Sequence, residues 1–203
     1  MYMKIINLFA AFVIAAVSTH VSANLLELDS AGTYEPMAST NDFFYGAAAG
    51  YDIGGNLYAT ALIDITFTYL GHEAGYNNDF NAYGGNLNNK THSEGASFTV
   101  NNVAAGLLDF NFYSNTISQG IANGNNQDFA SFQSFATILD YTYNGIFYDA
   151  IILFDDSGAG PDDNHDDHII GIRVAAVSEP GTLGLVIIGV ACLIATRRRL
   201  ARS

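Results

Sequence analysis

The feature that constrains the fold most is a pair of long alternating runs joined by Asn144-Gly145. The runs cover Phe135–Tyr143 and Ile146–Phe154. An Asn-Gly pair between two such runs favours a two-residue type I′ turn, because both turn positions need a positive φ. The predicted hairpin then places three pairs of apolar or aromatic residues opposite one another: Tyr143 with Ile146, Tyr141 with Tyr148, and Leu139 with Ala150.

Further strands are indicated by period-two alternation elsewhere in the chain. The longest such run is Leu57–Leu70, which we expect to form a single strand with one buried face. Shorter runs have the same character: Ala96–Val100, Leu108–Tyr113 and Ile169–Val177. Segments rich in Asn, Gly and Asp, notably Gly75–Asn89 and Asn123–Asp128, are expected to be turns and surface loops. The pattern predicts an all-β protein with a single antiparallel β-sandwich or jelly-roll-like domain at residues 24–177.

The N-terminal residues 1–23 have the three parts of a secretory signal peptide. Lys4 precedes a 13-residue apolar run, Ile5–Val17, and Val21 and Ala23 supply small side chains at positions −3 and −1 of a cleavage site. The apolar run is too short to span a bilayer comfortably. We therefore expect cleavage between Ala23 and Asn24.

Residues 178–203 form a second targeting segment. Residues 181–196 are uncharged and about 24 Å long as a helix, at 1.5 Å per residue. A basic cluster follows this predicted transmembrane helix: Arg197, Arg198, Arg199 and Arg202. Positive charge resists translocation, so the cluster should stay in the cytoplasm while residues 24–177 lie outside.

The order of these parts resembles the PEP-CTERM sorting signal of exopolysaccharide-producing Gram-negative bacteria, a tail sometimes named after an ice-binding protein. In this chain Glu179 and Pro180 match the Glu and second Pro of the family motif, and Ser178 stands at the first Pro. The resemblance implies recognition by an exosortase-type transpeptidase. It also implies export across the inner membrane, transient anchoring by residues 181–196, and delivery to the cell surface or extracellular matrix.

The charge distribution separates the targeting segments from the domain between them. The whole chain has a formal charge of −13, but residues 24–177 carry 19 acids against only Lys90 and Arg173, a formal charge of −17. This balance argues against nucleic-acid binding, which requires clustered Lys and Arg. The single cysteine, Cys192, lies in the predicted helix, so cysteine nucleophiles and thiolate metal sites are excluded from residues 24–177.

An acidic segment, residues 155–167, contains six aspartates in thirteen residues. Crowded carboxylates repel one another unless a hard cation neutralises them, and calcium takes 6–8 oxygen ligands. The predicted ligands are Asp155, Asp162, Asn164 and Asp166. The last three have the spacing of an EF-hand, but Asp167 replaces its glycine and Arg173 its final acid, so any calcium site is of another, weaker type. The alternative is a solvated acidic loop.

No catalytic residue is predicted. His72-Glu73 could act as an acid–base pair, and His165 and His168 lie in or beside the acidic segment, but none belongs to a recognisable catalytic motif. Three functions remain: a non-catalytic structural or interaction protein of the exopolysaccharide matrix, a calcium-dependent carbohydrate-binding module, and a secreted hydrolase. Extracellular polysaccharide is the expected partner of the first two.

Overall fold

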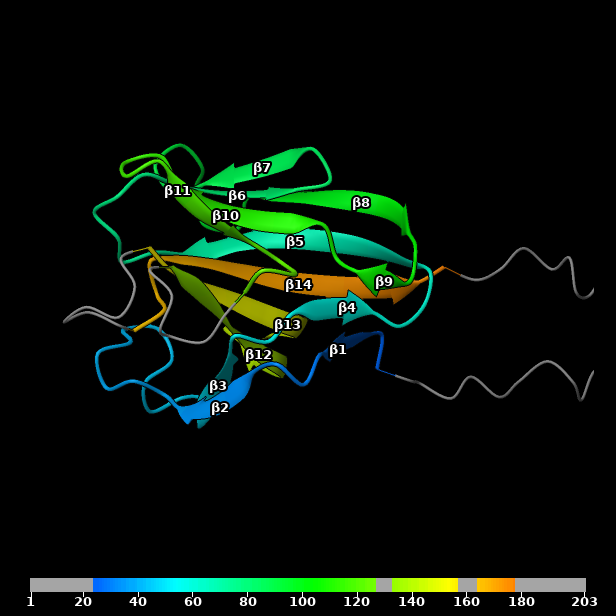
Figure 1. The fold of residues 1–203 in the computed structure, drawn as a ribbon, viewed down its shortest axis with the longest axis horizontal. Coiled ribbons are helices and arrows are strands. Elements are labelled where there is room, and N and C mark those ends of the chain that lie inside the picture. Colours follow the sequence, from blue (N-terminus) through cyan, green and yellow to red (C-terminus); the bar gives the residue numbers. More distant parts are fainter. Residues whose placement is uncertain (1–23, 127–132, 157–163, 178–203) are drawn as a thin grey trace, which may run out of the picture.

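The computed structural model describes residues 24–126, 133–156 and 164–177, which form an all-β structure with antiparallel strand pairing (Figure 1). The largest sheet has seven strands, in the order β2 (Thr33–Pro36), β3 (Gly50–Ile53), β12 (Ser134–Tyr143), β13 (Ile146–Asp155), β14 (His168–Ala176), β5 (Ile63–Gly71) and β8 (Ser97–Val103). A second sheet has four: β11 (Gln119–Ala122), β10 (Phe110–Ser114), β6 (Asn78–Ala82) and β7 (Gly85–Asn88). The third has three: β1 (Leu26–Leu28), β4 (Leu57–Ala59) and β9 (Gly106–Leu107).

The predicted hairpin is confirmed in β12 and β13. Tyr143 pairs with Ile146, and the register continues through all the expected pairs to Ser134 and Asp155. Asn144 and Gly145 have φ values of 50° and 79°, as a type I′ turn requires. A local turn preference therefore set the register of the two longest strands.

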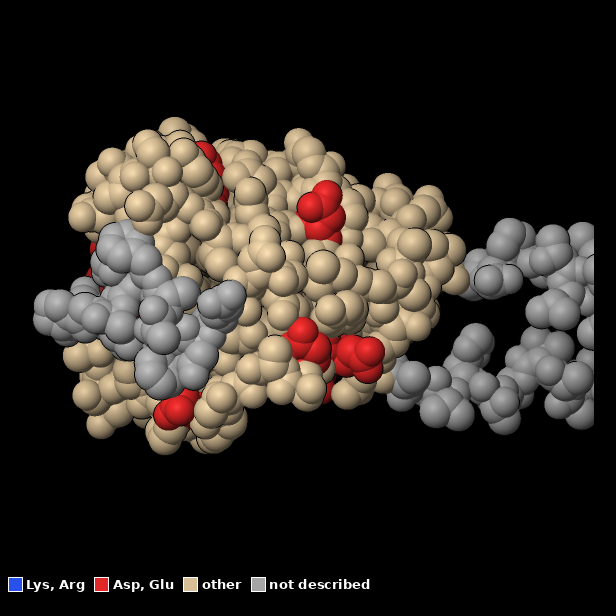
Figure 2. Space-filling view, viewed as in Figure 1, with Lys and Arg blue, Asp and Glu red and all other residues tan. Residues whose placement is uncertain are grey.

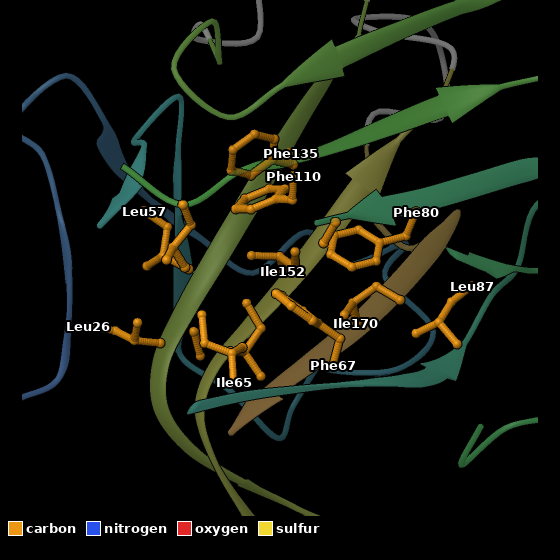
Figure 3. Close-up of a cluster of buried hydrophobic side chains, with 14 of the residues drawn as sticks. Leu26, Leu57, Ile65, Phe67, Phe80, Leu87, Phe110, Phe135, Ile152 and Ile170 are labelled. Atoms are coloured by element: carbon orange, nitrogen blue, oxygen red, sulfur yellow. The ribbon is translucent and has the colours of Figure 1, made fainter. Parts of the chain in front are cut away.

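The main core lies between the seven-stranded and four-stranded sheets. Phe67, Phe154 and Ile170 from the larger sheet meet Phe80 and Phe112 from the smaller one, and all five are buried. Figure 3 shows Phe67, Phe80 and Ile170 in this cluster. The rings of Phe112 and Phe154 are stacked at 4.8 Å between centroids. These aromatic contacts hold the two sheets face to face.

A second cluster covers the opposite face of the seven-stranded sheet. Met37 and Phe44, from the segment between β2 and β3, pack against Ile151, Leu153 and Ile169. The middle of the sheet is thus covered on both sides, which explains why Ala150–Phe154 is continuously apolar and buried rather than alternating.

One expected strand is divided in two. Leu57–Leu70 forms β4 and β5, which belong to different sheets, with a bend at residues 60–62 between them. The Thr60 amide donates to the Leu25 carbonyl, and the Leu62 carbonyl accepts from the Val177 amide, so the bend satisfies its backbone with two distant segments. The alternation of residue types continues through residues 60–62, so the sequence pattern could not predict the bend.

The expected loop at Gly75–Asn89 is also wrong, because it contains the hairpin of β6 and β7. Ala82 pairs with Gly85 across a two-residue turn at Tyr83-Gly84, whose φ values are 49° and 85°. Phe80, Ala82 and Leu87 point into the core while Asn side chains occupy much of the other face. The low strand propensity of Asn hid these strands from the sequence analysis.

The two ends of the domain lie at one end of the sheets, opposite the acidic segment (Figure 1). The Asn24 carbonyl accepts a hydrogen bond of 2.8 Å from the Thr60 hydroxyl, two residues from the Leu62 carbonyl that holds Val177. The signal peptide (residues 1–23) and tail (residues 178–203) predicted from the sequence lie outside the described residues. Within the described part of the chain, no helix is long and apolar enough to cross a bilayer.

Candidate functional site

The strongest candidate site is the end of the seven-stranded sheet where β13 finishes and β14 begins, which we call the acidic end. Of the four predicted calcium ligands, Asp155 closes β13, and Asn164 and Asp166 precede β14, whereas Asp162 lies outside the described residues. Ser178, Glu179, Pro180, the four clustered arginines and Ala23 also lie outside them. Asn24 is exposed at the opposite end of the domain.

The described residues at the two ends of the acidic segment are largely buried, whereas residues 157–163 lie outside the described part of the chain. Asp155 and Asp166 have no exposed surface, and Asn164 is 2% exposed. The segment folds back on β13, because the Asp167 amide donates to the Phe154 carbonyl at 3.1 Å. Its polar groups therefore need partners within the protein.

Asp166 is held by two loops from distant parts of the sequence. Its Oδ2 accepts a 2.8 Å hydrogen bond from the Asp42 amide, and its carbonyl accepts one of 3.0 Å from the Glu73 amide. Asn164 extends the contact, donating from Nδ2 to the Thr40 carbonyl at 3.2 Å and to Glu73 Oε2 at 3.3 Å. The acidic segment is thus clamped between the segment after β2 and the loop after β5.

Asn41 completes this clamp with neutral hydrogen bonds. Its Nδ2 donates to the Asn164 carbonyl at 2.8 Å, while its Oδ1 accepts from the amides of Phe43 and Phe44. Phe43 in turn packs over Gly71, the last residue of β5. A Cβ at Gly71 would lie 2.6 Å from the Phe43 ring, so this loop needs a residue without a side chain there.

The carboxyl groups of Asp166 and Glu73 lie close enough to interact. Burial, followed by this contact and by the charges of Glu73 and Asp42, raises the pKa of Asp166 to about 7. Its Oδ1 is buried and has no hydrogen-bond partner among the described residues. A proton shared by the two acids or a bound cation would relieve this repulsion.

Asp167 lies in a second group of acids beside the first. Its Oδ2 accepts from the Asp156 amide at 2.8 Å, and Asp156 Oδ2 accepts from Asn78 Nδ2 at 2.5 Å. Burial raises the pKa of Asp167 to about 8, and the charges of Asp156, Asp155 and Asp166 add to the increase. At neutral pH the acidic end therefore retains protons that exposed carboxylates would lose.

The interpretation of His165 and His168 as solvated loop residues is wrong, because neither side chain has any exposed surface. His168 lies between the rings of Tyr69 and Phe112, with centroids 5.2 and 5.8 Å away. Burial lowers the pKa of His168 to about 3, so it stays neutral near pH 7 and cannot serve as a proton donor there.

His165 forms the arrangement that most resembles a catalytic pair. Its Nε2 lies 2.8 Å from the Ser134 hydroxyl, a spacing suited to a nucleophile and its base. However, both residues are enclosed by the protein: His165 has no exposed surface and Ser134 is 1% exposed. The pair contributes to packing at the start of β12, where Ser134 is the first residue.

The side chains of His72 and Glu73, which were considered as an acid–base pair, have different partners. His72 Nδ1 contacts the Tyr69 hydroxyl, and its Nε2 is 3.4 Å from Lys90 Nζ. Burial and the Lys90 charge lower the pKa of His72. Glu73 instead contacts Asn164 and Asp166, and sequence analysis did not connect it with the acidic segment.

Two residues of the site, Asp42 and Glu73, were missed because no sequence spacing links them to Asp166. The signal that could have found Glu73 is the pairing of β5 with β14, in which Gly71 lies opposite Ile169. Within the described residues, no group of three or more His, Cys, Asp or Glu side chains is arranged to hold a metal.

No family model, curated protein or solved structure matches this chain. The function must therefore be argued from its residues and geometry.

Proposed function

We propose that this chain is an exported, surface-sorted protein whose β-sandwich domain, residues 24–177, acts as a structural or interaction component of an extracellular polysaccharide matrix, without catalysis. In this proposal residues 1–23 are a signal peptide, and residues 178–203 are a PEP-CTERM-like tail with a transmembrane helix. The tail is the substrate of an exosortase-type transpeptidase.

The observation that carries the proposal is that the two ends of the domain lie together, opposite the acidic end. Asn24 and Val177 are tied to the same bend, at Thr60 and Leu62, while the acidic end lies at the far end of the sheets. A domain attached through the tail that follows Val177 would therefore keep its opposite end and its sides free. This is the arrangement that a protein needs in order to present a surface away from a membrane.

The absence of a reachable catalytic pair in the described residues also favours a non-catalytic role. Ser134 and His165 are enclosed, His72 and Glu73 have different partners, and His168 is held neutral by burial. A hydrolase would need a nucleophile or carboxylate pair open to a polymer.

Cell fractionation tests the sorting proposal. The full chain and a variant truncated after Val177 are expressed in a bacterium that carries an exosortase-type transpeptidase. We expect the full chain in the membrane and surface fractions and the truncated chain in the periplasm or medium. A truncated protein that stays with the membrane would contradict the proposal, and Glu179→Ala tests whether the motif itself is read.

A calcium-dependent carbohydrate-binding module is the second candidate. It is favoured by Asp166, whose buried Oδ1 lacks a hydrogen-bond partner within the described residues and lies beside Glu73 and Asn164. These are hard oxygen donors of the kind that calcium prefers, and Asp155 and Asp162 would supply further ligands. Bound calcium would neutralise the carboxylates and join the two clamping loops to the acidic segment.

Thermal unfolding with and without calcium tests this candidate. At about 5 mM calcium, above the Kd of even weak extracellular sites, the melting temperature should rise. The rise should disappear in Asp166→Asn and Glu73→Gln but persist in Asp109→Asn, which removes an exposed acid elsewhere. An equal response of all four proteins, or none in the wild type, would exclude a specific site.

A further inference from the structure

A groove opens in the seven-stranded sheet where β3 separates from β12. These strands pair at only two positions, Ile53 with Ala136 and Asp52 with Thr137, and then diverge. The resulting cavity has a volume of about 370 Å³, within the range of small-molecule sites. We call it the tyrosine groove, because its lining includes Tyr34, Tyr51 and Tyr141.

Tyr34 presents its ring to solvent at the wall of the groove. It is 62% exposed, although aromatic rings are usually buried in a soluble domain. The ring lies close over Gly50, where an added Cβ would be 2.7 Å from the Tyr34 Cζ and hydroxyl. Gly50 therefore allows the ring to lie against the backbone of β3 and leaves the rest of the ring exposed.

A buried hydroxyl in the same groove lacks a partner. Thr137 lines the cavity and is 2% exposed, and its Oγ1 has no hydrogen bond to any described residue. Leaving such a group unpaired costs about 1–3 kcal/mol. The strand register places Tyr34, Asp52 and Thr137 in one row across β2, β3 and β12, so a single ligand could contact all three.

The charge of the domain selects the ligand class. Asp52 lines the groove, Asp29 acts on it electrostatically, and the domain carries −17 overall, so an anionic polymer would be repelled. Figure 2 shows a largely uncharged face on which acids form separate groups and no described Lys or Arg is visible. A purely apolar ligand would leave the Thr137 hydroxyl without a partner.

We propose that the tyrosine groove binds a neutral, hydroxyl-rich glycan. The C–H face of a sugar ring packs on Tyr34, and sugar hydroxyls donate to Asp52 and form a hydrogen bond with Thr137. The biological setting rests on the proposed function, since a matrix protein needs a polysaccharide contact. The binding itself does not depend on export or on calcium, and it is measured separately from both.

Isothermal titration calorimetry tests the groove with the full chain in a detergent without sugar groups. The probes are four neutral oligosaccharides, cellohexaose, laminarihexaose, mannohexaose and chitohexaose, each with EDTA present. At least one should bind. Tyr34→Ala should weaken that binding about fivefold to tenfold, because it removes the stacking surface.

Tyr45→Ala is the matched control. Tyr45 is also 62% exposed but does not line the groove, so its loss should change the affinity by less than about twofold. Thr137→Val gives a second diagnostic, because it removes the unpaired hydroxyl at nearly constant volume. This variant should bind more weakly while melting no lower than the wild type.

Three results would overturn the proposal. The first is that none of the four glycans binds in EDTA, including the case in which binding appears only when calcium is restored. The second is that Tyr34→Ala and Tyr45→Ala weaken binding equally, which would indicate nonspecific aromatic contact. The third is that a neutral peptide of alternating Thr and Val binds while the glycans do not, which would make the groove a docking site for a β-strand. Fractionation of the truncated chain remains a separate result in every case.

Discussion

Asp79 and Asp167 are both partly buried aspartates near the same end of the domain, yet their surroundings shift their pKa values in opposite directions. Asp79, on β6, accepts hydrogen bonds from three Asn side chains: Asn115 at 2.6 Å, Asn88 at 2.9 Å and Asn86 at 3.0 Å. Burial raises the pKa of Asp79, but these hydrogen bonds outweigh burial and the net shift is downward.

Burial also raises the pKa of Asp167, but here the neighbouring groups are acids. One amide hydrogen bond, from Asp156, does not offset burial and the surrounding carboxylates, so the pKa rises to about 8. The depth of burial and the partners of a carboxylate together decide whether it is stable as an anion. The charge of −17 is therefore not a uniform property of the domain, because part of it is suppressed at the acidic end.

The largest expected effect comes from removing the neutral amide that holds the acidic end together. Asn41→Ala loses three hydrogen bonds and leaves the Asn164 carbonyl without this donor in a buried site. We expect the free energy of unfolding to fall by about 3 kcal/mol. Urea unfolding at pH 6 measures it. A loss below about 1 kcal/mol would mean that the clamp contributes little to stability.

The second prediction tests the direction of the pKa shift of Asp167. A raised folded-state pKa stabilises the protein below the unfolded value of 3.8, and this stability is lost as the pH rises towards 8. The slope from one carboxyl is at most about 1.4 kcal/mol per pH unit. Asp167→Asn cannot ionise and should be more stable than the wild type by about 2 kcal/mol at pH 8, after allowance for solvent screening.

Unfolding curves recorded between pH 4 and pH 8 provide the measurement for Asp167→Asn. Parallel pH profiles for the wild type and the variant would show that Asp167 is ionised in the folded protein. In that case the contrast with Asp79 would disappear.

The smallest effect is expected at Asp79, with the opposite pH dependence. A lowered pKa stabilises the protein above 3.8, and this contribution is lost as the pH falls through the folded-state value. Asp79→Asn should cost about 1 kcal/mol at pH 7, since the group is partly screened by solvent, and almost nothing at pH 2. An equal loss of unfolding free energy at pH 7 and pH 2 would show that the effect comes from packing rather than from charge.

The sequence predicted the parts of the fold that depend on neighbouring residues. The Asn144-Gly145 turn fixed the register of nine residue pairs, because a positive φ at both positions admits few alternatives. The β6–β7 hairpin was missed although it uses the same kind of two-residue turn. Its first turn residue is Tyr83, which rarely adopts a positive φ, and its strands are rich in Asn.

The candidate site was predicted only where its residues are close in sequence. Asn164 and Asp166 were identified from local acidity, but Glu73 lies 91 residues from Asn164, and Asp42 lies 124 residues from Asp166. Those contacts follow from the pairing of β5 with β14 and from the position of the segment between β2 and β3. Neither follows from local propensity or spacing.

The placement of β14 has a mechanical consequence. Its nine residues run between β13 and β5, from the acidic end to Ala176 beside the end that leads into the tail. A tether attached at Val177 and a load applied at the opposite end would pull β14 along its own axis. The ladder hydrogen bonds on both of its sides would then be loaded together in shear, instead of being peeled apart one pair at a time.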